Sequence, residues 1–234
     1  MTPEFPTHAA SVTVAMLLAD ARLPSGGHAH SAGMEPAIVG GLPVADVPAF
    51  LIGRARTTTL VEAGTAVVAR HLTLRSMTSN SIDMWELERA WAARTPSSAM
   101  RDASLVLGRG YLRLASRVWP HAAALRRARE RSEAPPRAIV LGMIAAAAGL
   151  SAEDLARVTI YDEAHSAAAA VLKLEPRDPA DTISWVLDTC AAVEHLVPVL
   201  AELTTPDAIP AAGAPQAEGW AESHALMSQR LFRA

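Results

Sequence analysis

The chain of 234 residues is poor in cysteine and in aromatic side chains. Its one cysteine, Cys190, lies in an apolar segment of helical character. A lone cysteine builds neither a disulfide framework nor a cysteine-based zinc site, so we interpret Cys190 as a small buried hydrophobic residue in a reducing cytoplasm. Aromatic residues make up only 4% of the chain. The core therefore has to be built from small and aliphatic side chains.

An excess of positive charge is also missing. The formal net charge is −3, whereas a nucleic-acid-binding domain is normally basic on one face. The most arginine-rich run, residues 124–137, has no interleaved aromatic residues, so we interpret it as a solvated helix end. The first residues are acidic and interrupted by proline, unlike a signal peptide. The apolar run at residues 138–150 is shorter than the roughly 20 residues of a membrane span. We expect a cytoplasmic protein that binds neither nucleic acid nor membrane.

Strand signals are absent as well, because no useful stretch alternates polar and apolar residues with a period of two. Helical periodicity dominates, and alanine is the best helix former. We predict an all-α fold, a single-domain helical bundle of roughly ten helices. We expect a flexible N-terminal arm over residues 1–10, the helical domain over 11–204, and a loop with a partner-binding tail over 205–234. Proline- and glycine-rich breaks separate the helices near residues 23–33, 40–49, 132–137, 175–181 and 204–219.

Several helix ends can be predicted from single residues. Ser31 follows two glycines and is expected to cap the next helix, where Glu35 would favour the positive end of the helix dipole. Ser151 and Asp154 have the spacing of a capping box. Pro198 is expected to bend or loosen the last core helix.

The glycine-rich stretch LPSGGHAHSAGME, residues 23–35, is the most unusual segment of the chain. His28 and His30 lie two residues apart, but no further ligand stands nearby at a fixed spacing. We predict no metal site, and these two histidines are the first to test if a metal ion binds. Ser31 lies in AHSAG, which is similar to a Gly-x-Ser-x-Gly nucleophile elbow, a motif that has meaning only after a strand. A small serine hydrolase using Ser31 stays an alternative function.

Other patterns do not support an enzyme. Asp162, Glu163 and His165 lie on one predicted helix, but no second helix offers a matching Glu-x-x-His, so we interpret them as a polar patch on a helix surface. No Gly-Lys-[Ser/Thr] phosphate loop occurs, so we expect no nucleotide hydrolysis and no cofactor. The last residues, 220–234, combine Leu, Met, Phe and Arg, the composition of a segment that folds on a partner.

Four segments, taken together and in this order, resemble the urease accessory protein F (UreF) family. They are residues 17–38, 94–114, 161–176 and 224–234. The matching positions are Pro24, Gly26, Gly27, Ser31, Gly33 and Glu35 in the first, Arg101, Ser104, Gly108 and Arg109 in the second, Lys173 in the third, and His224, Arg230, Leu231, Phe232 and Arg233 in the last. The chain departs from the family in having histidines at positions 28 and 30, where aromatic residues are usual, and in lacking the glutamine after residue 176.

The resemblance implies an all-helical, dimeric protein without catalytic activity, a nickel-insertion chaperone. Such a protein bridges the urease accessory protein D/H and the GTPase UreG, and the assembly delivers nickel to apo-urease. Lys173 would lie on the surface that regulates the GTPase, and both terminal segments would contact the partners. The implied partner-binding residues are Pro24, Gly26, Gly27, Ser31, Glu35, Lys173, His224, Arg230, Phe232 and Arg233, with Arg101, Ser104 and Arg109 as a structural motif. A helical oligomer without a nickel role is a further alternative.

Overall fold

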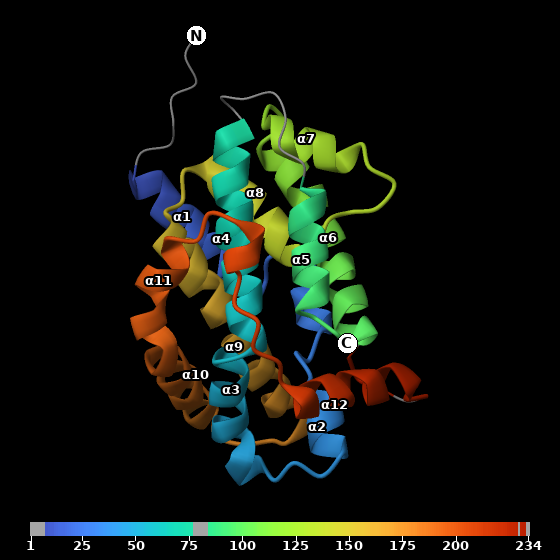
Figure 1. The fold of residues 1–234 in the computed structure, drawn as a ribbon. Coiled ribbons are helices and arrows are strands. Elements are labelled where there is room, and N and C mark those ends of the chain that lie inside the picture. Colours follow the sequence, from blue (N-terminus) through green and yellow to red (C-terminus); the bar gives the residue numbers. More distant parts are fainter. Residues whose placement is uncertain (1–7, 77–83, 229, 233–234) are drawn as a thin grey trace.

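The computed structural model describes residues 8–76, 84–228 and 230–232, and these form α-helices and short 3-10 helices without any strand. The predicted all-α fold is therefore confirmed (Figure 1). The α-helices are α1 (His8–Leu18), α2 (Met34–Val39), α3 (Val47–Ala55), α4 (Thr58–Ser76), α5 (Trp85–Ala93), α6 (Ser98–Val118), α7 (Ala123–Arg129), α8 (Arg137–Ala148), α9 (Ala152–Leu174), α10 (Pro179–Val193), α11 (Val197–Ala201) and α12 (Pro215–Leu226). The 3-10 helices are η1 (Gly27–Ala29), η2 (Val44–Asp46), η3 (Glu194–Leu196) and η4 (Pro206–Ala208).

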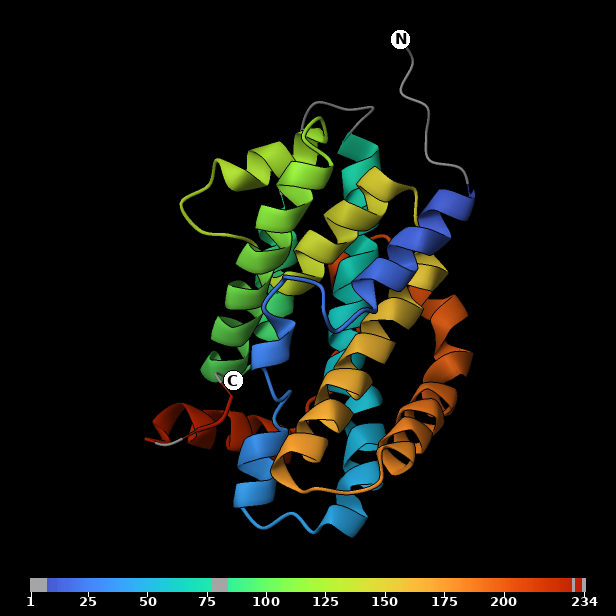
Figure 2. The same cartoon turned by 180° about the vertical axis from the view of Figure 1, so that it is seen from behind.

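Helices α4, α8 and α9 form the centre of the bundle, and α1 lies across α8 and α9 on the back (Figure 2). The centre is closely packed because small residues line the contact between α4 and α8. A Cβ atom on Gly142 of α8 would collide with the carbonyl oxygen of Ala66 and the methyl group of Ala69 in α4. The expectation of a core built from small side chains is therefore met at the heart of the fold.

The predicted helix ends have mixed outcomes. Ser151 caps α9, with its hydroxyl 3.0 Å from the backbone nitrogen of Asp154. The segment around Pro198 is loosened as expected, because α10 ends at Val193 and η3 separates it from α11. The predicted cap at Ser31 is wrong. The chain turns through Gly33 at a φ of +84°, so α2 begins only at Met34 and Gly33 is its N-cap.

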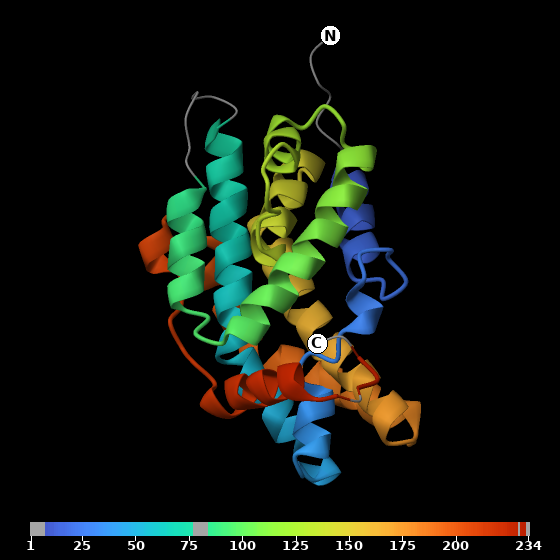
Figure 3. The same cartoon turned by 90° about the vertical axis from the view of Figure 1, so that its right-hand side faces the viewer.

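The two ends of the chain differ in how much of them is described. Helix α1 begins at His8, and residues 1–7 of the expected arm lie outside the described residues. At the other end, α12 lies between the lower end of α6 and the upper end of α2 and packs against both (Figure 3). The domain boundaries proposed from the sequence stay a prediction, because the packing of α12 on α2 and α6 does not separate the tail from the helical domain.

One stretch of the described residues, Pro179–Ala201, is long and apolar enough to cross a membrane by length and composition alone. It comprises α10, η3 and α11, of which α10 packs against α3 and α9. Only 28% of its most apolar window is buried, and three large side chains point to solvent, namely Ile183, Leu187 and Val199. The stretch therefore has one face in the bundle and one apolar face outside it.

Candidate functional site

The C-terminal tail is held against α2 by one buried carboxylate. The Glu35 side chain lies 2.9 Å from Nε2 of His224 and accepts hydrogen bonds from the backbone N–H groups of Leu231 and Phe232, the latter at 2.9 Å. Glu35, His224 and Phe232 are each about 4% exposed or less. These four residues, Glu35, His224, Leu231 and Phe232, are called the tail latch below. The latch joins two segments that are almost 200 positions apart in the sequence.

The electrostatics of the latch favour an ionised Glu35. Burial by itself raises the pKa of this carboxyl group. The backbone N–H groups of Leu231 and Phe232 and the His224 ring outweigh burial and hold the pKa below its ordinary value. Hydrogen bonds to the charged form of a carboxylate have this effect. Glu35 was expected to interact with the dipole of α2, and the structure adds the tail as its main partner.

Lys173 lies at the edge of the latch. It stands in the last turn of α9, and its Nζ is 3.4 Å from the carbonyl oxygen of His28 and 4.9 Å from the centroid of the Phe232 ring. A lysine ammonium over an aromatic face is a cation–π contact. The exposed end of α9, the glycine-rich loop and the C-terminal tail therefore meet at this one side chain.

The other sequence-derived site residues are spread over this region. Pro24 is exposed, Gly26 has a φ of +95° that favours glycine, and Gly27 begins η1. Arg230 is exposed and lines the central cavity described below. Arg233 lies outside the described residues.

Ser31 is fully buried, and its hydroxyl has no hydrogen-bond partner among the described residues. No base within that part of the chain activates it, which leaves the serine-hydrolase alternative without structural support.

The three residues of the expected structural motif behave differently from one another. The Arg101 guanidinium donates to the carbonyl oxygens of Thr95 and Pro96, each at 2.7 Å, and so holds the turn before α6. The buried Ser104 hydroxyl accepts from the backbone N–H of Arg137 at 3.1 Å and joins α6 to α8. Arg109 is exposed. The first two therefore bind elements of the fold together.

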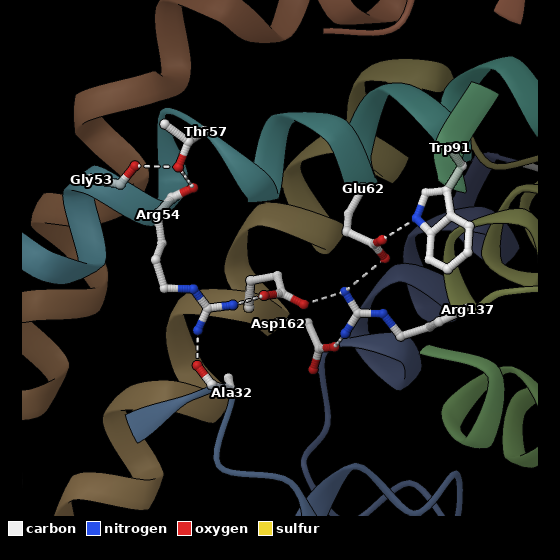
Figure 4. A network of polar contacts seen from close by, with 9 residues as sticks. Ala32, Gly53, Arg54, Thr57, Glu62, Trp91, Arg137 and Asp162 are labelled. Atoms are coloured by element: carbon white, nitrogen blue, oxygen red, sulfur yellow. Dashed lines mark hydrogen bonds and ion pairs between the residues drawn. The ribbon is translucent and has the colours of Figure 1, made fainter. Parts of the chain in front are cut away.

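A second group of charged side chains forms a network that joins several helices (Figure 4). Arg137, at the start of α8, pairs with Glu163, with Asp162 at 3.1 Å and with Glu62 at 3.7 Å. Arg54 pairs with Glu163 at 2.7 Å and donates to the carbonyl oxygen of Ala32. Trp91 Nε1 donates to Glu62 at 2.6 Å. Two guanidinium groups and three carboxyl groups thus share one buried region.

The interpretation of Asp162 and Glu163 as a surface patch is wrong. Helices α2, α3 and α4 pack against α9, and the two carboxylates are mostly withdrawn from water and pair with Arg54 and Arg137. Burial raises the pKa of Asp162, and it also raises that of Glu62. For Glu163, burial is outweighed by Arg137 and Arg54, and the pKa is lowered. The pKa of Arg137 is raised by its carboxylate neighbours in spite of its burial, so this guanidinium stays charged.

A cavity of about 440 Å³ opens over this network. The cavity is lined by mostly apolar residues of α6 and α12, by the charged groups and by Thr58, whose buried hydroxyl has no partner among the described residues. His30 lines the cavity, whereas His28 is exposed outside it. Within the described ranges, no three His, Cys, Asp or Glu side chains are grouped so as to hold a metal ion.

Sequence reasoning missed both Arg54 and Arg137 as partners of Asp162 and Glu163. The available signal was the occurrence of single charges inside apolar helical runs, as in LIGRA around Arg54 and TLVEAG around Glu62. A buried charge requires an opposite charge, so such residues can be searched for as pairs. Nothing in the sequence indicates which charges pair, because the pairs join different helices.

Comparison with known proteins gives a consistent result. The family model described as UreF matches residues 44–189. Curated proteins described as "Urease accessory protein UreF" are similar over most of the chain. The protein of Mycobacterium tuberculosis (strain H37Rv) is 38% identical over 173 residues, 73% of this chain and 76% of the relative. That of Mycobacterium marinum is 40% identical over 175 residues, with 72% and 76% covered. That of Mycobacterium sp. (strain JLS) is 34% identical over 196 residues, with 82% and 86% covered. The chain belongs to the UreF family of urease accessory proteins.

Proposed function

We propose that this chain is a nickel-insertion chaperone that bridges the urease accessory protein D/H and the GTPase UreG and regulates the GTP-dependent assembly of the urease nickel centre. It acts by binding and has no catalytic activity of its own. The observation that carries the proposal is the meeting of the exposed Lys173, the His28 loop and the buried Phe232 at one edge of the molecule. Family membership indicates a role in urease assembly, and this edge offers a binding surface built from three separate segments.

The physical basis of regulation is differential affinity. A chaperone alters the GTPase only if it binds one nucleotide state of UreG better than another. The exposed ammonium of Lys173 offers a positive charge for such discrimination. A surface that is ordered before binding loses less freedom on binding, which raises its affinity for the state it fits.

The partner-binding residues divide by burial. Pro24, Lys173 and Arg230 are exposed and suited to direct contact with D/H or UreG. Glu35, His224, Ser31 and Phe232 are buried and support the surface from beneath. Gly26, Gly27 and Arg233 complete the proposed set. The proposed route of nickel is through the assembled complex, and apo-urease is reached only through it.

We propose further that the chain forms a homodimer in the cytoplasm. The support is the exposed apolar face formed by Ile183, Leu187 and Val199, which a second copy would remove from water. Sedimentation of the purified chain with Leu187→Asp tests this. A shift from dimer to monomer is expected, and a dimer that persists unchanged contradicts this choice of face.

The experiment that tests the proposed function uses Lys173→Ala in the reconstituted system of D/H, UreG, apo-urease, nickel and GTP. We expect unchanged thermal unfolding but altered GTP turnover and altered urease activation. The control is Arg113→Ala, which removes an exposed cation from a different helix, α6. This variant should behave as the parent chain does. If the parent chain does not co-elute with D/H and its omission leaves urease activation unchanged, the proposal is wrong.

A further inference from the structure

Lys173 is the only lysine of the chain, which has arginine at its other 20 basic positions. A lysine side chain is long and flexible, and at an exposed helix end it normally samples many rotamers. Here its ammonium has two fixed neighbours, the carbonyl oxygen of His28 at 3.4 Å and the ring of Phe232 at 4.9 Å. The position of this ammonium therefore depends on segments far from α9 in the sequence.

The Phe232 ring is the more rigid of the two neighbours. It is 4% exposed and belongs to an apolar cluster with Met34, Leu51 and Val171. Its backbone N–H donates to Glu35 at 2.9 Å. The ring is thus held on both sides, by packing of its side chain and by the latch carboxylate on its backbone.

We propose that Phe232, held by Glu35, is the positioning residue that orients the Lys173 ammonium for its action on the GTPase partner. This inference rests on the proposed function and adds to it the source of the lysine's orientation. Phe232 itself does not contact the partner in this arrangement, because its ring is buried under the ammonium. The regulatory charge is therefore presented only while the tail is docked.

Amine reactivity gives a readout of this geometry that a purely structural role would not change. Because Lys173 is the single lysine, trace labelling with acetic anhydride reports on it alone, with the N-terminal amine as the internal reference. We expect Phe232→Leu to raise the labelling rate of Lys173 about two- to fivefold. This factor corresponds to the free energy of an exposed cation–π contact. Phe232→Tyr keeps an aromatic face and should label as the parent chain does.

A matched control separates the ring from the loss of volume. Phe50 belongs to the same apolar cluster, and its nearest aromatic partner is Trp220, at 5.3 Å between ring centroids. Phe50→Leu removes the same atoms without touching Lys173. Thermal unfolding of both leucine variants shows whether they are folded, and we expect only Phe232→Leu to alter the labelling rate.

Turnover of GTP by UreG in the reconstituted complex completes the test. Lys173→Ala and Phe232→Leu should shift turnover in the same direction, and the double variant should equal Lys173→Ala alone. If Lys173→Ala changes turnover while Phe232→Leu leaves labelling and turnover unchanged, the inference is wrong and the proposed function stands. Additive effects in the double variant also overturn it, since the ring would then act independently of the lysine. If Lys173→Ala has no effect on turnover, both the inference and the proposed role of Lys173 fail.

Discussion

Substitution of Glu35 by glutamine is the sharpest perturbation of the tail latch. The change keeps the shape of the side chain but removes its charge and replaces one acceptor oxygen by an NH₂ donor. Oε2 of Glu35 pairs with His224 and the N–H of Phe232, and Oε1 accepts from the N–H of Leu231. A glutamine with its amide oxygen at the Oε2 position therefore keeps two of these donors and leaves the Leu231 N–H facing an NH₂ group. The docked tail is destabilised relative to the released tail.

The magnitude follows from the hydrogen bonds that are lost. A hydrogen bond to a charged group contributes about 1.5–3 kcal/mol, so the loss of one destabilises docking by about that amount. Each 1.4 kcal/mol corresponds to a tenfold change in an equilibrium constant. The population of released tail should therefore rise by about one to two orders of magnitude, or to complete release if the parent tail opens readily.

Limited proteolysis measures this release directly. Trypsin cleaves after Arg230, and the N–H of that scissile bond belongs to Leu231, which donates to Glu35 in the docked tail. Cleavage therefore requires the tail to leave the latch, and its rate follows the open population when opening is fast. We expect cleavage after Arg230 to accelerate strongly in Glu35→Gln. The control is Glu153→Gln, which removes an equally charged but half-exposed side chain from the first turn of α9.

A cleavage rate in Glu35→Gln within about twofold of the parent rate would refute the reasoning, because the latch would then contribute less than about 0.5 kcal/mol. Accelerated cleavage in both variants would point to a general effect of charge on the protease. Thermal unfolding distinguishes local release from global unfolding, and we expect the midpoint to change far less than the cleavage rate, since α12 and the tail lie at the edge of the bundle.

Three further predictions concern pH, packing and buried charge. The pKa of Glu35 is lowered in the docked state. The latch should therefore be fully effective above the ordinary glutamate pKa of about 4.3 and be lost as the pH falls through the lower, folded-state pKa. Hydrogen-exchange protection of the Leu231 and Phe232 amides measures this loss. Gly142→Ala should destabilise the fold by about 1–3 kcal/mol through overpacking. The control Gly53→Ala has open space around the added Cβ atom and should be neutral or stabilising. Denaturant unfolding of both variants measures the difference. Arg137→Met should destabilise by about 3–5 kcal/mol because it leaves buried carboxylates unpaired, and an unchanged unfolding midpoint in urea would contradict the network.

The buried network differs from the latch in what it stabilises. The latch fixes a peripheral tail, whereas Arg137 joins α8 to α9 and α4 at the centre of the fold. Its three carboxyl partners outnumber the two guanidinium groups by one, and burial raises the pKa of Asp162 and Glu62. The network therefore resists further negative charge, and it favours a cation or a proton over an anion in the cavity above it.

The sequence by itself determined the fold class and the family. Helical periodicity, alanine content and the proline breaks suffice for an all-α bundle, because these signals act within single segments. The Ser151 cap and the interruption near Pro198 are local in the same sense, and both were predicted correctly. Four motifs in order identified the family, although none of them is specific alone.

Only the tertiary structure decided which distant residues act together. Ser31 was predicted as a cap, but the left-handed turn at Gly33 shifts the helix start beyond it. The sequence predicts a solvated patch at Asp162 and Glu163, whereas in the structure α2, α3 and α4 pack against this helix. The bonds of Glu35 to the tail and the contact of Lys173 with Phe232 join segments far apart in the sequence. Such pairings depend on how helices cross, and periodicity within one segment carries no information about the partner that a buried charge will find.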